Sequence, residues 1–290
     1  MIFTSDSTVV DAELIDICIP CMNDGSSLPA TVRSCLANNN IKKINIGLNA
    51  CTDNSEYFAQ QFGGNSKVNI IIYDERLDML SNWIRLLLSS TAQYVKLVPC
   101  GDTIYEGCLD HQLSLYQSYS SNNISLLSSA RRVCHTNKLI TYLFSLIPGK
   151  NKDAKVIPFE QIKNIFGYTP ENVFGEPACI LFNGQLLRDT LSDPEFSHYM
   201  LTCSQKYPYV VDLALYFAVL LKFTHHPALF DSVPVANFNV SRSSGTWRLR
   251  TRHHSDLIGF LSFNSVEVTL IGRLFSRIKA FIRFIIYAVA

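Results

Sequence analysis

The chain has 290 residues, of which 48% are hydrophobic and 17% charged, and its formal net charge is +1. This length can bury a sizeable core, and the composition excludes an intrinsically disordered chain. A net charge so close to zero gives no whole-chain signature of nucleic-acid binding. The nine cysteines are scattered, and no histidine at zinc spacing accompanies Cys18 and Cys21. Without a signal peptide, we expect reduced thiols in a cytoplasmic protein.

Predicted strands and helices alternate over the first 110 residues. Short apolar runs predict the strands, and apolar residues at helical spacing predict the helices between them. The expected strands are 14–20, 42–49, 68–74 and 94–102, and the expected helices are 26–39, 55–64 and 78–91. This alternation predicts an α/β fold with a mostly parallel sheet that is covered by helices on both faces.

A polar loop follows each of the four predicted strands. The loops are 20–27, 49–55, 74–78 and 100–103, and each is rich in Asn, Asp, Ser or Thr. One such loop is ordinary turn chemistry, but ligands of parallel sheets gather at the carboxyl ends of the strands. Four polar loops on one edge therefore predict a binding cleft. Neither GxGxxG nor a P-loop motif is present, so the common dinucleotide and P-loop fingerprints are absent.

The second half of the chain has a less regular pattern. Its predicted features are a strand at 123–135, an exposed loop at 148–152, a turn entering a strand at 175–187, helices at 193–207 and 210–223, and a Ser/Gly/Arg loop leading into a helix at 234–261. No internal repeat and no clean linker interrupts it. We therefore expect one domain over residues 1–262 and a C-terminal extension over 263–290.

The last residues of the chain have an unusual charge pattern. Residues 270–290 carry four basic side chains and no acid, and apolar residues recur at helical spacing. This pattern predicts a basic amphipathic helix that suits an anionic membrane surface. The alternative is a helix that packs on the domain with its arginines in solvent. No apolar run reaches the roughly 18 residues that a membrane-spanning helix needs.

Six segments in order resemble family 2 glycosyltransferases of the GT-A fold, a Rossmann-like architecture. "DICIPCMNDGSSLPATVRSCLANN" is similar to the strand, "IP-x-x-N" and helix that open that family, and "GLNACTDNS" to its "SDNASTDGT" segment. "DERLDMLSNWIRLLLSSTAQYVKLVPCGD" resembles the stretch that ends in the family's aspartate motif. "NVFGEPACILF", "YPYVVDLALYFAVLL" and "SRSSGTW" resemble later blocks of bacterial polysaccharide and O-antigen type transferases. The resemblance covers roughly residues 14–250.

The resemblance implies inverting transfer of a sugar from a nucleotide-sugar donor to a saccharide or lipid-linked acceptor in surface polysaccharide synthesis. It implies a nucleotide-binding half over about 14–110 and an acceptor half over about 111–262. It places the chain in the cytoplasm, peripheral to the inner face of the cell membrane through residues 270–290. The residues that it places at the nucleotide are Pro20, Asn23, Asp24, Asn49, Asp53, Arg76 and Asn82.

The resemblance also implies the groups that do the chemistry. Asp102 would hold Mg²⁺ or Mn²⁺ on the donor diphosphate, and Asp212 would be the catalytic base, with Glu176 in the acceptor site. Arg242 and Trp247 border a Ser-Gly loop, where a guanidinium could pair with diphosphate and an indole could stack on a sugar or base. The plainer alternatives are helix caps and turns for the two aspartates, a solvated charge for Glu176, and a basic surface around one core Trp.

The chain departs from the family at its acidic positions. Leu48 replaces an Asp that commonly contacts the base, and Pro99 and Gly101 stand where the aspartate motif has acids. These departures favour a second hypothesis, a glycosyltransferase-like binding or scaffold protein that has lost catalysis. A third hypothesis, a nucleotidyltransferase-like enzyme, is disfavoured by the missing glycine-rich phosphate loop. Cys100, beside Asp102, has no His and acid placed to activate it, so we expect a buried structural thiol.

Overall fold

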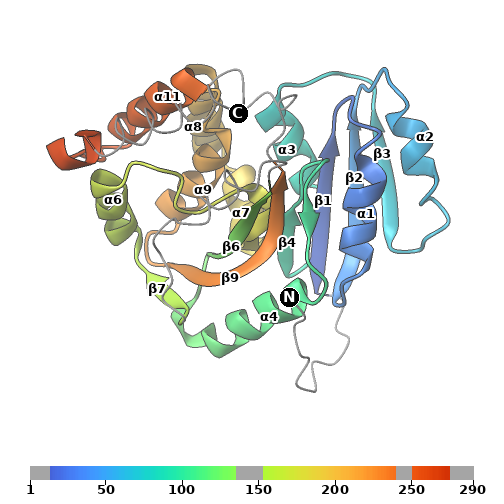
Figure 1. Cartoon of the computed structure of the whole chain (residues 1–290), viewed down its shortest axis with the longest axis horizontal. Coiled ribbons are helices and arrows are strands. Elements are labelled where there is room, and N and C mark those ends of the chain that lie inside the picture. Colours follow the sequence, from blue (N-terminus) through green and yellow to red (C-terminus); the bar gives the residue numbers. More distant parts are fainter. Residues whose placement is uncertain (1–13, 135–152, 240–249, 275–290) are drawn as a thin grey trace.

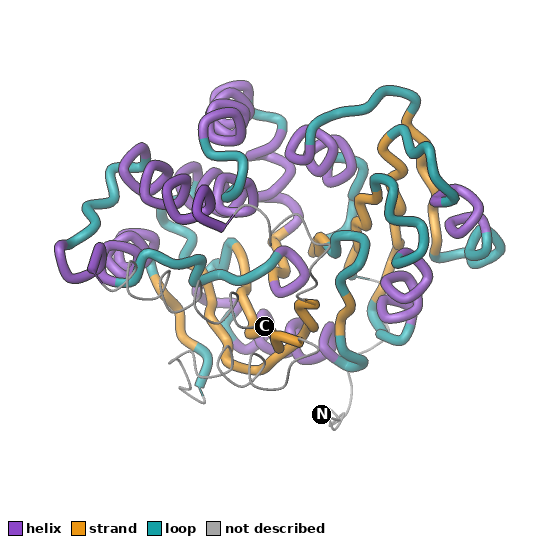
Figure 2. Tube along the Cα trace, turned by 45° about the horizontal axis from the view of Figure 1, so that its top comes forward, coloured by secondary structure: helices purple, strands orange, loops and turns teal. Residues whose placement is uncertain are grey.

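The structure is a computed structural model in which residues 14–134, 153–239 and 250–274 are described. Its strands form one nine-stranded sheet in the order β3-β2-β1-β4-β8-β6-β9-β5, with β7 paired to β9. Helices lie on both sides of this sheet, so the architecture has three layers (Figures 1 and 2). The predicted mixed α/β fold with a mostly parallel sheet and flanking helices is confirmed.

The first half forms the parallel part of the sheet. β1 pairs in parallel with β2 and β4, and β2 pairs in parallel with β3. The elements are β1 (Ile15–Cys21), α1 (Leu28–Leu36), β2 (Ile41–Asn49), α2 (Ser55–Gln60), β3 (Val68–Tyr73), α3 (Met79–Leu87) and β4 (Tyr94–Leu97). Each of them lies where the sequence predicts it. β4 ends before residue 102 because the chain turns at Gly101, whose φ is +100°.

The second half adds an antiparallel strand and then a second parallel pair. β8 is antiparallel to both β4 and β6, and β6 is parallel to β9. The strands are β5 (Thr103–Ile104), β6 (Leu126–Cys134), β7 (Lys155–Ile157), β8 (Ile180–Asn183) and β9 (Ala228–Asn239). The helices are α4 (Cys108–Ser118), α6 (Phe159–Tyr168), α7 (Gly184–Leu191), α8 (Pro194–Lys206), α9 (Val211–Lys222) and α11 (Arg250–Phe263), with 3₁₀ turns at Ser120–Asn122 and Pro177–Cys179.

Two predictions for the second half were wrong. Residues 234–239 belong to β9 and not to a loop, because this part of β9 pairs with β6 and with the short strand β5. Residues 184–187 begin α7 and do not continue a strand. Asn183 ends β8 there, and its side chain accepts hydrogen bonds from the backbone N–H groups of Gln185 and Leu186.

Each face of the sheet carries its own hydrophobic core. One core joins the sheet to α3, α6, α7, α8, α9 and α11, and the other joins it to α1, α2 and α4. β1 is buried over its whole length and contributes to both, since Cys18 belongs to the first core and Ile17 and Ile19 to the second. Residues of both halves of the chain share the first core, so the two halves are packed together.

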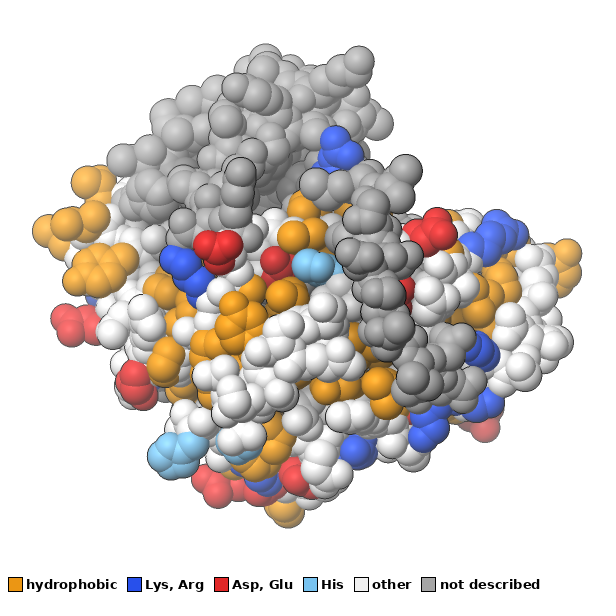
Figure 3. Space-filling model, turned by 90° about the horizontal axis from the view of Figure 1, so that it is seen from below, with side chains coloured by type: hydrophobic (Ala, Val, Ile, Leu, Met, Phe, Trp, Pro, Cys, Tyr) orange, Lys and Arg blue, Asp and Glu red, His pale blue; other side chains and the backbone are white. Residues whose placement is uncertain are grey.

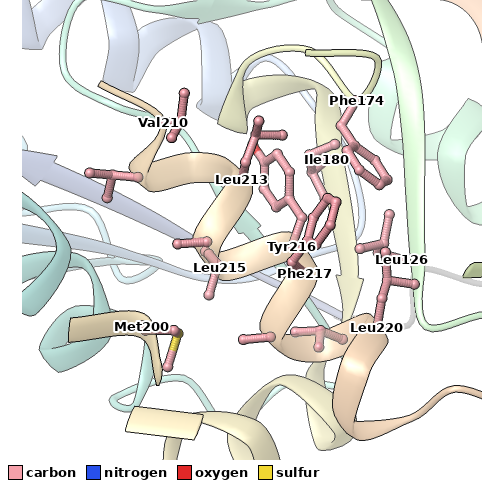
Figure 4. Close-up of a cluster of buried hydrophobic side chains, with 14 of the residues drawn as sticks. Leu126, Phe174, Ile180, Met200, Val210, Leu213, Leu215, Tyr216, Phe217 and Leu220 are labelled. Atoms are coloured by element: carbon pink, nitrogen blue, oxygen red, sulfur yellow. The ribbon is translucent and has the colours of Figure 1, made fainter. Parts of the chain in front are cut away.

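α9 is the most deeply buried helix of the described part of the chain. Its residues from Leu213 to Leu220 have exposures of 1% or less. Tyr216 and Phe217 pack beside Phe174 and Ile180 (Figure 4), with ring centroids 5.3 Å apart for Tyr216 and Phe174. Such all-round burial fixes the helix, and with it the residue at its first turn, Asp212.

The segment after α11 splits into a packed and an exposed part. Val266 and Val268 are buried in the core, whereas Leu270, Ile271 and Leu274 are 84%, 71% and 60% exposed. Residues 270–274 are helical, and the rest of the predicted amphipathic helix, 275–290, lies outside the described residues. No described helix combines the length and the apolar character that crossing a membrane requires.

Charges on the described surface are mixed in sign. On the face in Figure 3, acidic and basic side chains are interspersed with apolar and polar ones. This agrees with the near-zero net charge of the sequence.

Candidate active site

The loops after β1 and β2 are tied to each other by side chains that the sequence assigns to the nucleotide. Asn23 Oδ1 accepts from the backbone N–H of Thr52 at 2.7 Å, and Asn23 Nδ2 donates to Thr52 Oγ1 at 3.2 Å. The backbone N–H of Gly25 donates to Asp53 Oδ2 at 3.1 Å. The hydroxyl of Ser55, followed by backbone N–H groups, holds the pKa of Asp53 below its ordinary value. Asn23 and Asp53 thus fix the shape of the loops.

Glycine is required where these two loops meet. A Cβ on Gly25 would lie 2.7 Å from the backbone N and Cα of Ser55, closer than real Cβ contacts. The loops approach each other so closely only because residue 25 has no side chain. Pro20 is buried near the end of β1, and Asp24 is partly buried and accepts from Ser27 Oγ at 2.7 Å.

Asn49, at the end of β2, anchors the third loop. Its side chain makes two hydrogen bonds to the backbone of Leu77, from Nδ2 to the carbonyl at 2.8 Å and from the Leu77 N–H to Oδ1 at 3.0 Å. Arg85 Nη2 donates to Oδ1 of both Asn49 (3.1 Å) and the buried Asn82 (3.3 Å). The Arg85 guanidinium also lies over the ring of Tyr73, with Cζ 3.4 Å from its centroid.

Arg85 lies on α3 and contacts this loop, and no sequence motif pointed to it. It lies one helical turn after Asn82, and that spacing was the available signal. Arg76, by contrast, is exposed at the same edge of the sheet. Leu48 is 1% exposed and lies in the hydrophobic core, so its position offers no polar group to a base.

The turn after β4 presents Asp102. The backbone N–H of Asp102 donates to the carbonyl of Pro99 at 3.0 Å, and Gly101 has a φ of +100°. This is the geometry of a type II turn, which requires positive φ at its third residue. Gly101 also donates its N–H to Thr31 Oγ1 at 3.0 Å. The positive φ gives residue 101 a conformational reason to be glycine.

Asp102 titrates abnormally. Burial, and next the negative charge of Glu176, raise the pKa of Asp102 to about 7, against a partial opposing effect of Arg131. Glu176 precedes the 3₁₀ turn Pro177–Cys179 and forms an ion pair with Arg131 of β6, Nη1 to Oε1 at 2.7 Å. The turn after β4 and the loop before β8 thus bring the carboxyl groups of Asp102 and Glu176 within electrostatic reach of each other.

Asp212 joins the same cluster from the start of α9. Burial, followed by the charge of Glu176, raises the pKa of Asp212 to about 7. Asn172 Nδ2 donates to Asp212 Oδ2 at 2.6 Å. Three predicted site residues, Asp102, Glu176 and Asp212, therefore converge around Arg131. Neither Arg131 nor Asn172 was predicted. Arg131 reaches the carboxyl groups through the strand pairing of β6, and Asn172 reaches them through the folding of the loop after α6.

This cluster suits proton transfer and a hard cation. A carboxyl group with a pKa of about 7 can accept a proton near neutral pH. Within the described ranges, no three His, Cys, Asp or Glu side chains lie close enough to hold one metal ion. Asp102 nevertheless fits Mg²⁺ or Mn²⁺, because a dication would relieve the unfavourable charge on its partly buried carboxylate, and Mg²⁺ takes its other ligands from phosphate and water. Arg242 and Trp247 lie outside the described residues.

Comparisons with models of protein families and with curated proteins each return no match. Solved structures with the same fold do match. Staphylococcus aureus TarS 1–349 in complex with UDP superposes with a TM-score of 0.56 and 10% identity over 90% of this chain and 68% of that one. For TarS 1–349 without the nucleotide and for the longer TarS, the chain spans only 60% and 41% of their lengths.

A second enzyme shows the same likeness. Mycobacterium tuberculosis glucosyl-3-phosphoglycerate synthase, in complex with Mn²⁺, UDP and glucosyl-3-phosphoglycerate, superposes with a TM-score of 0.52 and 11% identity, over 86% of this chain and 80% of that one. Both neighbours are glycosyltransferases of the GT-A type, and at this level of identity the likeness concerns the fold. The chain therefore has the GT-A fold.

Proposed function

We propose that this chain is a nucleotide-sugar glycosyltransferase of family 2, of the bacterial polysaccharide and O-antigen type. The observation that carries the proposal is the convergence of Asp102, Glu176 and Asp212 beside the loops after β1, β2 and β4. Solved structures with the same fold bind UDP and UDP-GlcNAc, which supports a nucleotide sugar as the donor.

In the proposed reaction the two halves of the chain have separate tasks. The interlocked loops that contain Asn23, Asp53 and Asn49 hold the nucleotide at the carboxyl ends of the parallel strands. Asp102 would hold Mg²⁺ or Mn²⁺, and that ion supplies positive charge that stabilises the leaving diphosphate.

Asp212 acts on the acceptor. Its carboxylate takes the proton of the acceptor hydroxyl, whose oxygen forms a bond to the anomeric carbon while the bond from that carbon to the diphosphate breaks. Attack from the side opposite the leaving group inverts the configuration. Burial, and next the charge of Glu176, which Arg131 holds in place, raise the pKa of Asp212 to about 7, so the base is ready to accept a proton at physiological pH.

Peripheral membrane contact belongs to the same proposal. Leu270, Ile271 and Leu274 are exposed on the first turn of the C-terminal helix, and the sequence beyond it is basic and apolar. An amphipathic helix of this kind suits an anionic inner membrane face and a lipid-linked acceptor.

A catalytically inactive binding protein on the same fold is the second candidate. Leu48 is buried in the core, and Pro99 and Gly101 build a turn with a single carboxylate. A chain that has lost catalysis would keep the loops that hold the nucleotide but would no longer transfer the sugar.

The test is calorimetric titration of the full chain with UDP-, GDP-, dTDP- and CMP-sugars, each with and without Mn²⁺. We expect one donor to bind, and to bind at least tenfold more tightly with the metal. Asp102→Asn should remove the metal dependence, whereas Asp189→Asn, an exposed change on α7, should keep it. Donor binding without any sugar transfer or hydrolysis would favour the catalytically inactive binding protein. Binding of no donor would exclude both candidate functions.

A further inference from the structure

Two cysteines, Cys21 and Cys100, lie next to each other beside the loops after β1 and β2. Cys21 is the last residue of β1, and the β1–β4 register pairs Cys18 with Leu97. The backbone N–H of Cys100 donates to the carbonyl of Pro20 at 3.2 Å, which continues the same ladder. Cys21 and Cys100 are therefore neighbours across two parallel strands, and both pack in the core on the α1 side of the sheet.

The pairing between the strands places the two thiols next to each other, and each thiol also contacts a loop. In its thiolate form Cys21 can accept a hydrogen bond from Cys100, which is the main cause that lowers the pKa of Cys21 to about 7. Cys100 Sγ also donates to the carbonyl of Asp24 at 3.2 Å, and Cys21 Sγ donates to Ser55 Oγ at 3.6 Å. Cys100 is partly exposed, which gives small oxidants access to the pair.

Other cysteines differ from this pair. Cys18 lies in the core on the opposite face of the sheet, where its thiol donates to the carbonyl of Leu86. Cys35, Cys108 and Cys179 are buried, and burial raises the pKa of each to about 12. Cys51 is the nearest competitor, because its Sγ lies 3.5 Å from the carbonyl oxygen of Cys21.

We propose that Cys21 and Cys100 form a reversible disulfide, and that this bond weakens nucleotide-sugar binding; the second part rests on the proposed function. With hydrogen peroxide as the oxidant, a sulfur–sulfur bond forms and the peroxide O–O bond breaks. The two thiols give up two electrons and two protons, and the products are the disulfide and two molecules of water.

The bond would act on the site through the Pro99–Asp102 turn. A disulfide needs an S–S distance of about 2.0 Å, well below that of a thiol hydrogen bond. Closing this gap draws Cys100 away from the carbonyl of Asp24 and moves the turn that presents Asp102. We expect oxidation to reduce the affinity for the donor at least tenfold.

The experiment oxidises the full chain with hydrogen peroxide, alkylates the remaining thiols with N-ethylmaleimide, and maps linked peptides by mass spectrometry without reduction. We expect a Cys21–Cys100 link that dithiothreitol removes. Cys51→Ser should keep the link, and Cys100→Ser should abolish it. Absence of the link in the wild type, or a Cys21–Cys51 link in its place, would overturn the proposal.

Donor titration of the reduced and oxidised chain tests the second part. A loss of at least tenfold in affinity, absent from Cys100→Ser when its own two states are compared, supports the coupling, and equal affinities contradict it. If the reduced chain binds no donor, the proposed function fails while the disulfide stands. Hydrogen exchange of residues 99–104 then decides the coupling, because unchanged exchange between the redox states contradicts it.

Discussion

Asn172 joins Asp212 to the loop that carries Glu176. Its Nδ2 donates to Asp212 Oδ2 at 2.6 Å and to the carbonyl of Gly175 at 3.1 Å, while its Oδ1 accepts from the backbone N–H groups of Phe174 and Gly175 at 3.1 Å. One amide thus sets both the orientation of the proposed base and the path of the loop beside it. Asn172 acts through Asp212 and is a positioning residue.

The first prediction concerns this amide. Asn172→Asp keeps the acceptor for the loop N–H groups but removes the donor to Asp212 and adds a negative charge next to it. We expect kcat to fall about 100-fold, since misplacement of a catalytic group by about 1 Å has effects of that order. The KM for the donor should change little. The pH at which kcat/KM is half-maximal should rise, because a neighbouring carboxylate raises the pKa of Asp212.

Asn172→Ala is the control that separates the loss of the hydrogen bond from the effect of the added charge. Asn172→Ala also removes the donor to Asp212, but it adds no charge. Its activity should fall with a smaller rise in the pH profile than for Asn172→Asp, because the loss of one hydrogen bond raises the pKa of Asp212 less than that loss together with an added negative charge. Equal pH profiles of the two variants and the wild type would contradict the role that we assign to this residue.

The second prediction is a pH dependence of activity. Asp212 must be ionised to accept a proton, and its pKa is raised to about 7. We expect kcat/KM to rise about tenfold per pH unit below 7 and to level off above 8. The measurement is kcat/KM between pH 5.5 and 9 at saturating Mn²⁺. A flat profile would exclude Asp212 as the base.

The same raised pKa predicts the pH dependence of stability. A carboxyl group whose pKa is higher in the folded than in the unfolded chain stabilises the fold fully below the unfolded value. That contribution is lost as the pH rises through the folded value of about 7. Between pH 5 and 8 the free energy of unfolding should therefore fall. Asp212→Asn should reduce this fall by about 1 to 3 kcal/mol, as measured by urea unfolding without metal. An equal fall in both proteins would show that Asp212 titrates normally.

The fourth prediction uses the contact between the first two loops. Gly25→Ala places a Cβ 2.7 Å from the backbone of Ser55, so the loops must separate. We expect a loss of about 1 to 3 kcal/mol in stability, the usual cost of overpacking, together with weaker donor binding. Gly64→Ala is the matched control, since nothing lies within 4 Å of its Cβ. The measurements are thermal melting and donor titration of both variants. Equal melting temperatures and equal donor affinities of the two variants would contradict a role for Gly25 in the site.

The first half of the fold could be predicted because its signals are local. β1 to β4 are apolar runs with helices between them, and parallel pairing follows from that alternation. β9 could not be predicted in full, because Pro234 and Asn237 suit loops and pairing with β6, and with β5 for Asn237, keeps them in a strand. β5 has two residues, too few for any periodicity to mark it.

Some residues of the candidate site could likewise be predicted from the sequence, and others could not. Asp102, Glu176 and Asp212 stand at motif positions, so the sequence names them. Arg131 was not named, because it has the same chemistry as its neighbour Arg132 and nothing in the sequence says which one faces the carboxylates. In the structure Arg131 binds Glu176, whereas Arg132 is exposed. Successive side chains of β6 point to opposite faces of the sheet, so only one of the two arginines can face the carboxylates. The register of β6 with β8 and β9 decides which one does.

The last prediction concerns the C-terminal helix. Leu270, Ile271 and Leu274 are exposed, and the sequence that follows is basic. We expect the full chain to co-sediment with vesicles that contain phosphatidylglycerol and much less with pure phosphatidylcholine, because both apolar insertion and anionic lipid contribute to binding. The double variant Leu270→Glu/Leu274→Glu should lower the vesicle affinity at least tenfold. Leu201→Glu, a change at a leucine of α8 that is 42% exposed, should leave it unchanged. Equal binding to both vesicle types, or an equal loss in the control, would contradict a membrane-binding role for this helix.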